Sequence, residues 1–174
     1  MIPSLLSLPL FFYLAKARST EAPSEVDLSK PKIAFFILSK FIYFIAAAYS
    51  FFLPLKLGTT WFYVGLPLTL IGLVTSWMVL IDWARTPPDK LVSRGLYRYS
   101  RHPMYVTTSL LLLGVSIASA SWIFLLFTII FMVGAVFFIG LEEQGCLEIY
   151  GKAYHEYVKR TPRWIGIPKS SKSD

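Results

Sequence analysis

The stretch Met104–Leu141 reads MYVTTSLLLLGVSIASASWIFLLFTIIFMVGAVFFIGL and contains 38 residues without a single charged side chain. One membrane-spanning helix needs about 20 apolar residues, so this stretch is long enough for two. Its middle, Ser116–Ser121, consists of small and slightly polar residues, which suit a tight turn. The stretch therefore predicts a helical hairpin, Met104–Ser119 followed by Trp122–Leu141.

Three further segments are apolar enough to be considered as spans. Ile33–Leu55 and Thr60–Ile81 have the required length. Ile2–Ala15 is shorter and resembles a signal peptide. However, Lys16 and Arg18 follow its apolar core, whereas a secretory signal carries its positive charges in front. This order favours an uncleaved anchor that starts outside the cell or organelle.

The composition agrees with a membrane protein. Of 174 residues, 55% are hydrophobic and only 16% are charged, compared with about 25% charged in an average soluble domain. A soluble globular domain, a disordered chain and a disulfide scaffold are poor fits. Cys146 is the one cysteine, so no internal disulfide forms, and no Cys/His spacing indicates a metal site. The net charge of +7 on so apolar a chain indicates membrane orientation and not nucleic-acid binding.

The distribution of lysine and arginine predicts the topology. Residues 16–32 hold four, residues 82–103 hold five and residues 142–174 hold six, whereas the opposite side holds only Lys56. The positive-inside rule places the basic segments in the cytoplasm, with the N-terminus outside. We therefore expect an all-α, polytopic membrane helix bundle with a C-terminal hairpin and cytoplasmic cofactor-binding segments, formed by one domain, residues 1–174. The expected five spans are about 2–15, 33–55, 60–81, 104–119 and 122–141, followed by a cytoplasmic tail over 142–174.

The polar residues collect in two segments that flank the hairpin, Asp89–Tyr105 and Glu142–Trp164. Folding the hairpin brings these segments together at one membrane face. Pro103 suits the first turn of a helix, which puts Arg101 and His102 at the helix mouth. Free backbone N–H groups and the helix dipole favour an anion there.

Glu142 and Glu143 end the last predicted span. The dipole disfavours carboxylates at a helix C-terminus, so either the helix continues to about Tyr150 or these carboxylates are retained for a partner. Successive helical residues point about 100° apart. We therefore expect at most one of the two carboxylates to face a site between helices.

Several motifs occur together in the chain. They are Leu-Val-x-x-Gly-x-Tyr at 91–97, Arg-His-Pro-Met-Tyr at 101–105, Glu-Glu at 142–143, Tyr-Gly-x-x-Tyr-x-x-Tyr at 150–157 and Pro-Arg-Trp at 162–164. Over roughly residues 60–168 this combination resembles the isoprenylcysteine carboxyl methyltransferase and phospholipid methyltransferase group of integral membrane enzymes. The resemblance implies S-adenosylmethionine-dependent methyl transfer at the cytoplasmic membrane face. The acceptor would be a membrane-embedded amphiphile, either a lipid or an isoprenylcysteine-like compound.

The resemblance also implies which residues contact the cofactor. They are Asp89, Lys90, Leu91, Val92, Tyr97, His102, Pro103, Met104, Tyr105 and Glu142. The chemistry is compatible, because a carboxylate such as Glu142 suits the cofactor's ammonium group and the rings of Tyr97 and Tyr105 suit its adenine and sulfonium. No catalytic residue is assigned. A carboxylate acceptor needs no base, whereas an amine acceptor would need assistance from Glu143 or His102.

The expected substrate-side residues are Phe138, Glu143 and Arg101. Enzymes that act on prenylated cysteine carry an arginine one turn before the Glu142 position, where this chain has Phe138. In those enzymes the arginine is expected to meet the carboxylate of the substrate, so its absence here weakens the prenylcysteine interpretation. Arg85 or Arg101 could still supply the cation from another segment. Two other classes stay open: a sterol-type reductase that uses NADPH, some of which share the Arg-His-Pro-x-Tyr turn on longer chains, and a non-enzymatic membrane scaffold.

Overall fold

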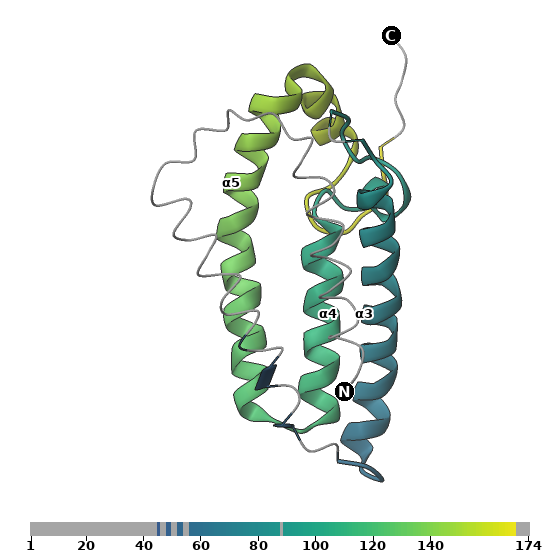
Figure 1. The fold of residues 1–174 in the computed structure, drawn as a ribbon, viewed down its shortest axis with the longest axis vertical. Coiled ribbons are helices and arrows are strands. Elements are labelled where there is room, and N and C mark those ends of the chain that lie inside the picture. Colours follow the sequence, from purple (N-terminus) through teal and green to yellow (C-terminus); the bar gives the residue numbers. More distant parts are fainter. Residues whose placement is uncertain (1–44, 46–47, 50–51, 54–55, 88, 170–174) are drawn as a thin grey trace.

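The computed structural model describes residues 45, 48–49, 52–53, 56–87 and 89–169. This part of the chain is helical and contains no β-strand, which confirms the predicted all-α class there (Figure 1). The predicted span 2–15 and nearly all of 33–55 lie outside these residues. The helices are α3 (Thr60–Ala84), the short 3₁₀ helix η1 (Gly95–Arg98), α4 (Pro103–Ala118) and α5 (Trp122–Arg160).

Two of these helices are long and apolar enough to cross a membrane, namely α3 and α5. The apolar helix α4 has 16 residues, which corresponds to a length of about 24 Å. It is therefore shorter than a hydrocarbon core of about 30 Å. The lengths and compositions of α3 and α5 fit an integral membrane protein.

The helix boundaries follow from local sequence signals. The Ser121 side chain accepts a hydrogen bond from the backbone N–H of Phe124 and so caps α5. Pro103 occupies the first turn of α4, as predicted. Between these helices Ala120 adopts a φ of 48°. The turn lies within the predicted Ser116–Ser121 segment, so the hairpin is confirmed.

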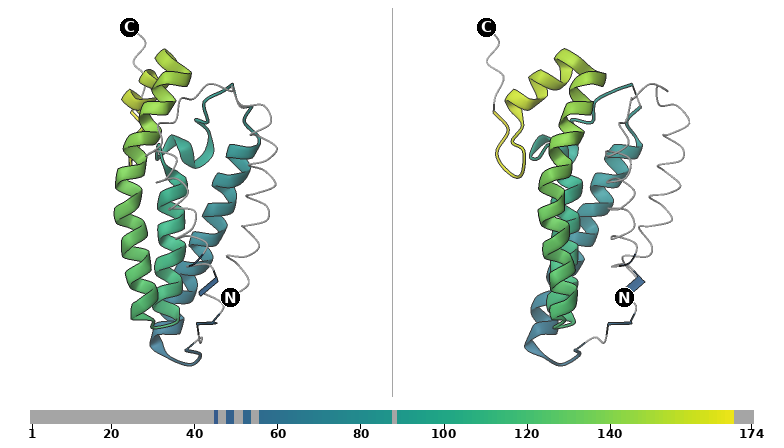
Figure 2. Two further views of the ribbon diagram at one scale, coloured as in Figure 1. Left: turned by 60° about the vertical axis from the view of Figure 1, so that its left-hand side comes forward. Right: turned by 90° about the vertical axis from the view of Figure 1, so that its left-hand side faces the viewer.

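Helices α3 and α4 run side by side with their backbones in contact (Figures 1 and 2). A Cβ atom added at Gly72 would lie 2.5 Å from the backbone nitrogen of Leu111, and one at Gly114 would lie 2.4 Å from that of Thr69. Gly65 makes the same kind of approach to the backbone of Ala118, at the end of α4. Small residues of this kind let membrane helices pack closely. We did not predict this pairing, although the glycines recur seven residues apart on α3.

Helix α5 joins α4 near the hairpin turn. The hydroxyl oxygens of Ser116 and Thr128 are 3.0 Å apart, and both side chains are buried. Leu112 and Phe124 belong to a buried apolar cluster at this end. The start of α4 is linked to the middle of α5 by charged side chains, which form the candidate site.

The end of α5 differs from the predicted span. The helix passes Leu141 and continues to Arg160, with a break at Gly151, where φ is 50° and ψ is −121°. Glu142 and Glu143 therefore lie inside a helix whose backbone hydrogen bonds continue beyond them, and the dipole penalty at a helix end does not apply. After the break the chain turns back over the bundle (Figure 2). Of the two alternatives left open by the sequence, the helix does continue.

Candidate active site

His102 lies at the mouth of α4 and is enclosed by the two carboxylates of α5. Its side chain is 5% exposed, with Nδ1 3.6 Å from Oε2 of Glu142 and Nε2 3.2 Å from Oε1 of Glu143. The expectation that at most one carboxylate faces this site is therefore wrong. The two glutamates diverge on the helix, but the two ring nitrogens of one histidine also point in different directions, so a single imidazole contacts both.

Glu143 is the centre of a cluster of cations. Nη1 of Arg101 lies 2.8 Å from its Oε1, and the guanidinium of Arg163 donates to both of its carboxylate oxygens. Burial alone would raise the pKa of Glu143, but the hydrogen bond from Arg163, the charge of Arg101 and the hydrogen bond with His102 outweigh it and hold the pKa below its ordinary value. These contacts favour a structural role for Glu143 over the substrate-side role expected from the sequence.

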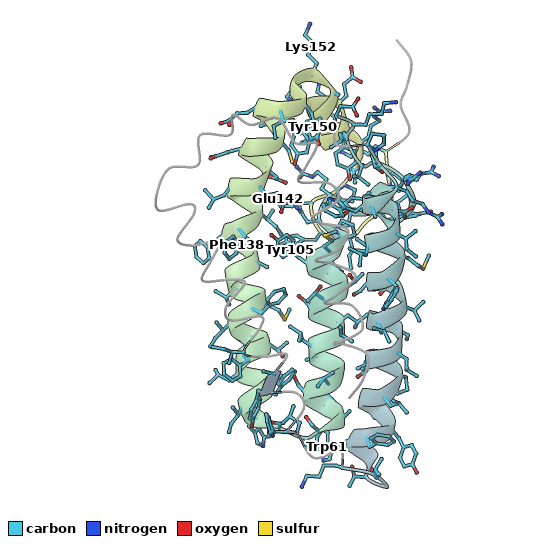
Figure 3. All side chains as sticks on the ribbon, in the orientation of Figure 1. Trp61, Tyr105, Phe138, Glu142, Tyr150 and Lys152 are labelled. Carbon is cyan, nitrogen blue, oxygen red and sulfur yellow. The ribbon has the colours of Figure 1, made fainter. Side chains whose placement is uncertain are left out.

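Glu142 is the accessible member of the pair. Its side chain is 51% exposed, and its Oε2 lies 3.6 Å from Nδ1 of the buried His102. The rings of His102 and Tyr105 have centroids 6.1 Å apart. Figure 3 shows Glu142 and Phe138 on neighbouring turns of α5, with Tyr105 on α4 at this level. Glu142 therefore offers a positioned carboxylate to a cationic group arriving from outside the protein.

The turn before His102 is held by the last part of α5. The hydroxyl of Tyr157 donates to the backbone oxygen of Tyr97 at 2.6 Å and to that of Ser100 at 3.3 Å. Burial raises the pKa of Tyr157, so the phenol stays protonated and able to donate. The backbone N–H of Arg101 donates to the oxygen of Pro162 at 2.9 Å. Sequence reasoning included Tyr157 in a motif but assigned it no role.

Other predicted cofactor residues lie in a buried apolar cluster. Val92 and Tyr97 are 7% and 8% exposed and pack with Val79, and Met104 is partly buried against them. The Tyr97 side chain is thus part of the core beside the site. Leu91 is half-buried, Pro103 is buried, and Asp89 and Lys90 are exposed.

Asp82 is a positioning residue that the sequence reasoning missed. It lies in the last turn of α3, and its Oδ1 is 3.5 Å from Nε of Arg94. Gly95 has a φ of 56°, and a Cβ atom there would lie 1.9 Å from Oδ2 of Asp82. Asp82 therefore contacts the segment that leads into η1 and helps to hold it in place. The available signal was a lone carboxylate at the end of a predicted span.

Comparison with known protein families bears on this arrangement. Residues 60–153 match the family model described as phospholipid methyltransferase. The chain belongs to this family. The match confirms the predicted resemblance and indicates a membrane methyltransferase. It includes His102, Glu142 and Glu143, and it ends before Tyr157 and Arg163. No curated protein and no solved structure matches the chain.

Proposed function

We propose that this member of the phospholipid methyltransferase family transfers a methyl group from S-adenosylmethionine to an amphiphilic acceptor held in the membrane. The proposal includes the topology expected from the charge distribution, with residues 82–103 and the tail after Leu141 in the cytoplasm. The observation that carries it is Glu142, a half-exposed carboxylate placed 3.6 Å from the ring of the buried His102.

The side chains present fit the methionine end of this cofactor. Glu142 would hold the ammonium group through a charge-assisted hydrogen bond, and the start of α4 beside His102 would face the carboxylate. Tyr105 supplies an aromatic ring next to Glu142 for a cationic group. When bound, S-adenosylmethionine supplies a methyl group already activated by its sulfonium charge.

The protein's contribution to the reaction would then be orientation more than proton transfer. Holding an acceptor in line with an activated methyl group can contribute roughly 7–11 kcal/mol. A carboxylate acceptor needs no proton acceptor on the enzyme. For an amine acceptor, Glu143 is a poor base because its pKa is lowered by Arg163 and Arg101. His102 is then the candidate base, because Glu142 is assigned to the ammonium group of the cofactor.

Replacing Glu142 by glutamine tests the proposed cofactor contact. The variant keeps the side-chain volume and removes one charge-assisted hydrogen bond, worth about 1.5–3 kcal/mol. We expect S-adenosylmethionine to bind about tenfold to a hundredfold more weakly, as measured by calorimetry on detergent-purified protein. The matched control is Glu148→Gln, because Glu148 is an exposed carboxylate on the same helix.

An unchanged affinity in Glu142→Gln would remove Glu142 from the cofactor site. Titration of the unmodified protein with NADPH separates the alternative classes. Binding of NADPH without binding of S-adenosylmethionine would favour the reductase, and binding of neither would favour a scaffold.

The acceptor is proposed from Phe138, which lies four residues before Glu142 and on the same helix face. A half-buried phenyl ring gives an acyl or prenyl chain an apolar surface and gives a carboxylate no cation. We therefore propose a lipid acceptor, with low activity toward prenylcysteine analogues.

Phe138→Arg is expected to increase carboxyl methylation of a farnesylcysteine analogue, because a cation is then placed one turn from Glu142. The measurement is transfer of a radiolabelled methyl group in mixed micelles. Phe137→Arg is the matched control, since Phe137 is 65% exposed on a neighbouring face. Strong methylation by the unmodified enzyme that Phe138→Arg fails to raise would contradict the acceptor proposal.

A further inference from the structure

The segment that follows α5 forms a closed loop beside the mouth of α4. The backbone N–H of Lys169 donates to the oxygen of Arg160 at 2.9 Å, which closes the loop. Gly166 N–H donates to the oxygen of Tyr99 at 3.0 Å, and Tyr99 lies four residues before the first residue of α4. Figure 2 shows this loop, in yellow, returning from the end of α5 toward the bundle. The loop tip therefore lies at the level where α4 enters the apolar layer.

The loop tip exposes large apolar side chains. Trp164 is 41% exposed, Ile165 is 73% exposed and Ile167 is 89% exposed, and the neighbouring Tyr99 is 49% exposed. By contrast, residues 150–163, which form the last part of α5 and the start of the loop, expose no large apolar side chain. Leu147 and Ile149 on α5 are 44% and 47% exposed, and after them the exposed large apolar side chains occur in the part of the chain that has returned to the level of the α4 mouth.

Cationic side chains surround this apolar tip. Lys169 follows it in sequence and Arg98 adjoins Tyr99, and both residues are exposed; the preceding Arg163 is paired with Glu143. Tryptophan and tyrosine are enriched at the membrane–water interface, and nearby lysine and arginine are attracted to anionic lipid headgroups. The combination at one level of the molecule matches a bilayer surface in both polarity and charge.

We propose that Trp164, Ile165 and Ile167 lie in the headgroup region of the bilayer and that this loop is an interfacial membrane contact. The inner side of the same loop holds the backbone of Tyr99 and, through Pro162, that of Arg101. Contact with lipid at the tip therefore helps to hold the turn that carries His102. This proposal does not depend on methyl transfer.

An environment-sensitive fluorophore tests the position of the tip. In a Cys146→Ser background, Ile167→Cys is labelled with a nitrobenzoxadiazole dye and reconstituted as the full chain in vesicles of phosphatidylcholine and phosphatidylglycerol. Lys152→Cys is the matched control, because Lys152 is an exposed residue at the opposite extreme of the same cytoplasmic region (Figure 3). The label at 167 is expected to emit at shorter wavelength than the label at 152.

Brominated lipid identifies what covers the label. When phosphatidylcholine is replaced by a form brominated near the headgroup end of its acyl chains, the label at 167 should lose most of its emission and the label at 152 should keep it. Equal emission wavelengths and equal quenching at both positions would overturn the proposal. A blue-shifted label at 167 that brominated lipid fails to quench would overturn it as well, because a protein surface would then cover the tip.

Discussion

The Glu143→Gln variant is expected to lose about 3 kcal/mol of unfolding free energy. The substitution keeps the side-chain shape but leaves Arg101, which is 13% exposed, without its carboxylate partner. Removing one partner of a buried ion pair costs about 3–5 kcal/mol. The low end applies here because Arg163, the second cation paired with Glu143, is 43% exposed and is not a buried charge. Unfolding by SDS in mixed micelles, followed by tryptophan fluorescence, would measure the loss.

The matched control is Glu156→Gln. Glu156 and Arg160 form a surface pair whose side chains are 69% and 51% exposed, and such pairs contribute about 0.5 kcal/mol or less. A Glu143 variant as stable as this control would show that the cluster contributes little to folding.

The same cluster should make stability depend on pH. Because the pKa of Glu143 is lower in the folded state than in the unfolded chain, its contribution is complete above the ordinary glutamate pKa of about 4.3. It is lost as the pH falls through the lower folded value. Glu143→Gln should therefore flatten the acid limb of the stability profile.

Gly114→Leu is expected to destabilise the protein by about 3 kcal/mol. Even a Cβ atom at this position would lie 2.4 Å from the backbone of Thr69, so α3 and α4 must separate to admit a side chain. Overpacking of a close contact typically costs about 1–3 kcal/mol, and a rigid backbone neighbour puts this site at the upper end. The SDS unfolding midpoint is the measurement.

Gly134→Leu is the matched control for the helix contact. No atom lies within 4 Å of a Cβ built at Gly134, and leucine has the higher helix propensity. We expect this control to be as stable as the unmodified protein or slightly more stable. Equal losses in both variants would mean that helix propensity or hydrophobicity, and not the α3–α4 contact, causes the effect.

The sequence predicted the helical hairpin closely because apolar length is a local property. The turn was expected within Ser116–Ser121, and α4 ends at Ala118 while α5 begins at Trp122. The end of α5 was not predicted from hydrophobicity, because residues past Leu141 are polar and the helix there is supported by contacts with the turn before His102. The break at Gly151 requires a positive φ, which glycine permits without indicating the direction of the chain that follows.

The sequence predicted that polar residues of the segments Asp89–Tyr105 and Glu142–Trp164 form the candidate site. It also predicted that these segments lie together, because the hairpin between them returns the chain to the same membrane face. From the sequence we assigned Glu142 to the cofactor and Glu143 to the substrate side, but we did not predict that Glu143 is bound by cations. Glu142 and Glu143 are adjacent and identical in sequence, yet one is half-exposed beside His102 and the other is held between Arg101 and Arg163.

The sequence by itself determined the all-α class, the membrane character, the hairpin and the family, because these depend on apolar length, charge distribution and short motifs. Only the tertiary structure decided that the last part of α5 turns back, that Tyr157 holds the turn before His102, and that Glu143 is bound by cations while Glu142 stays accessible. The physical reason is that burial and charge pairing depend on distances between segments far apart in the chain. A side chain's environment is set by what the fold brings to it.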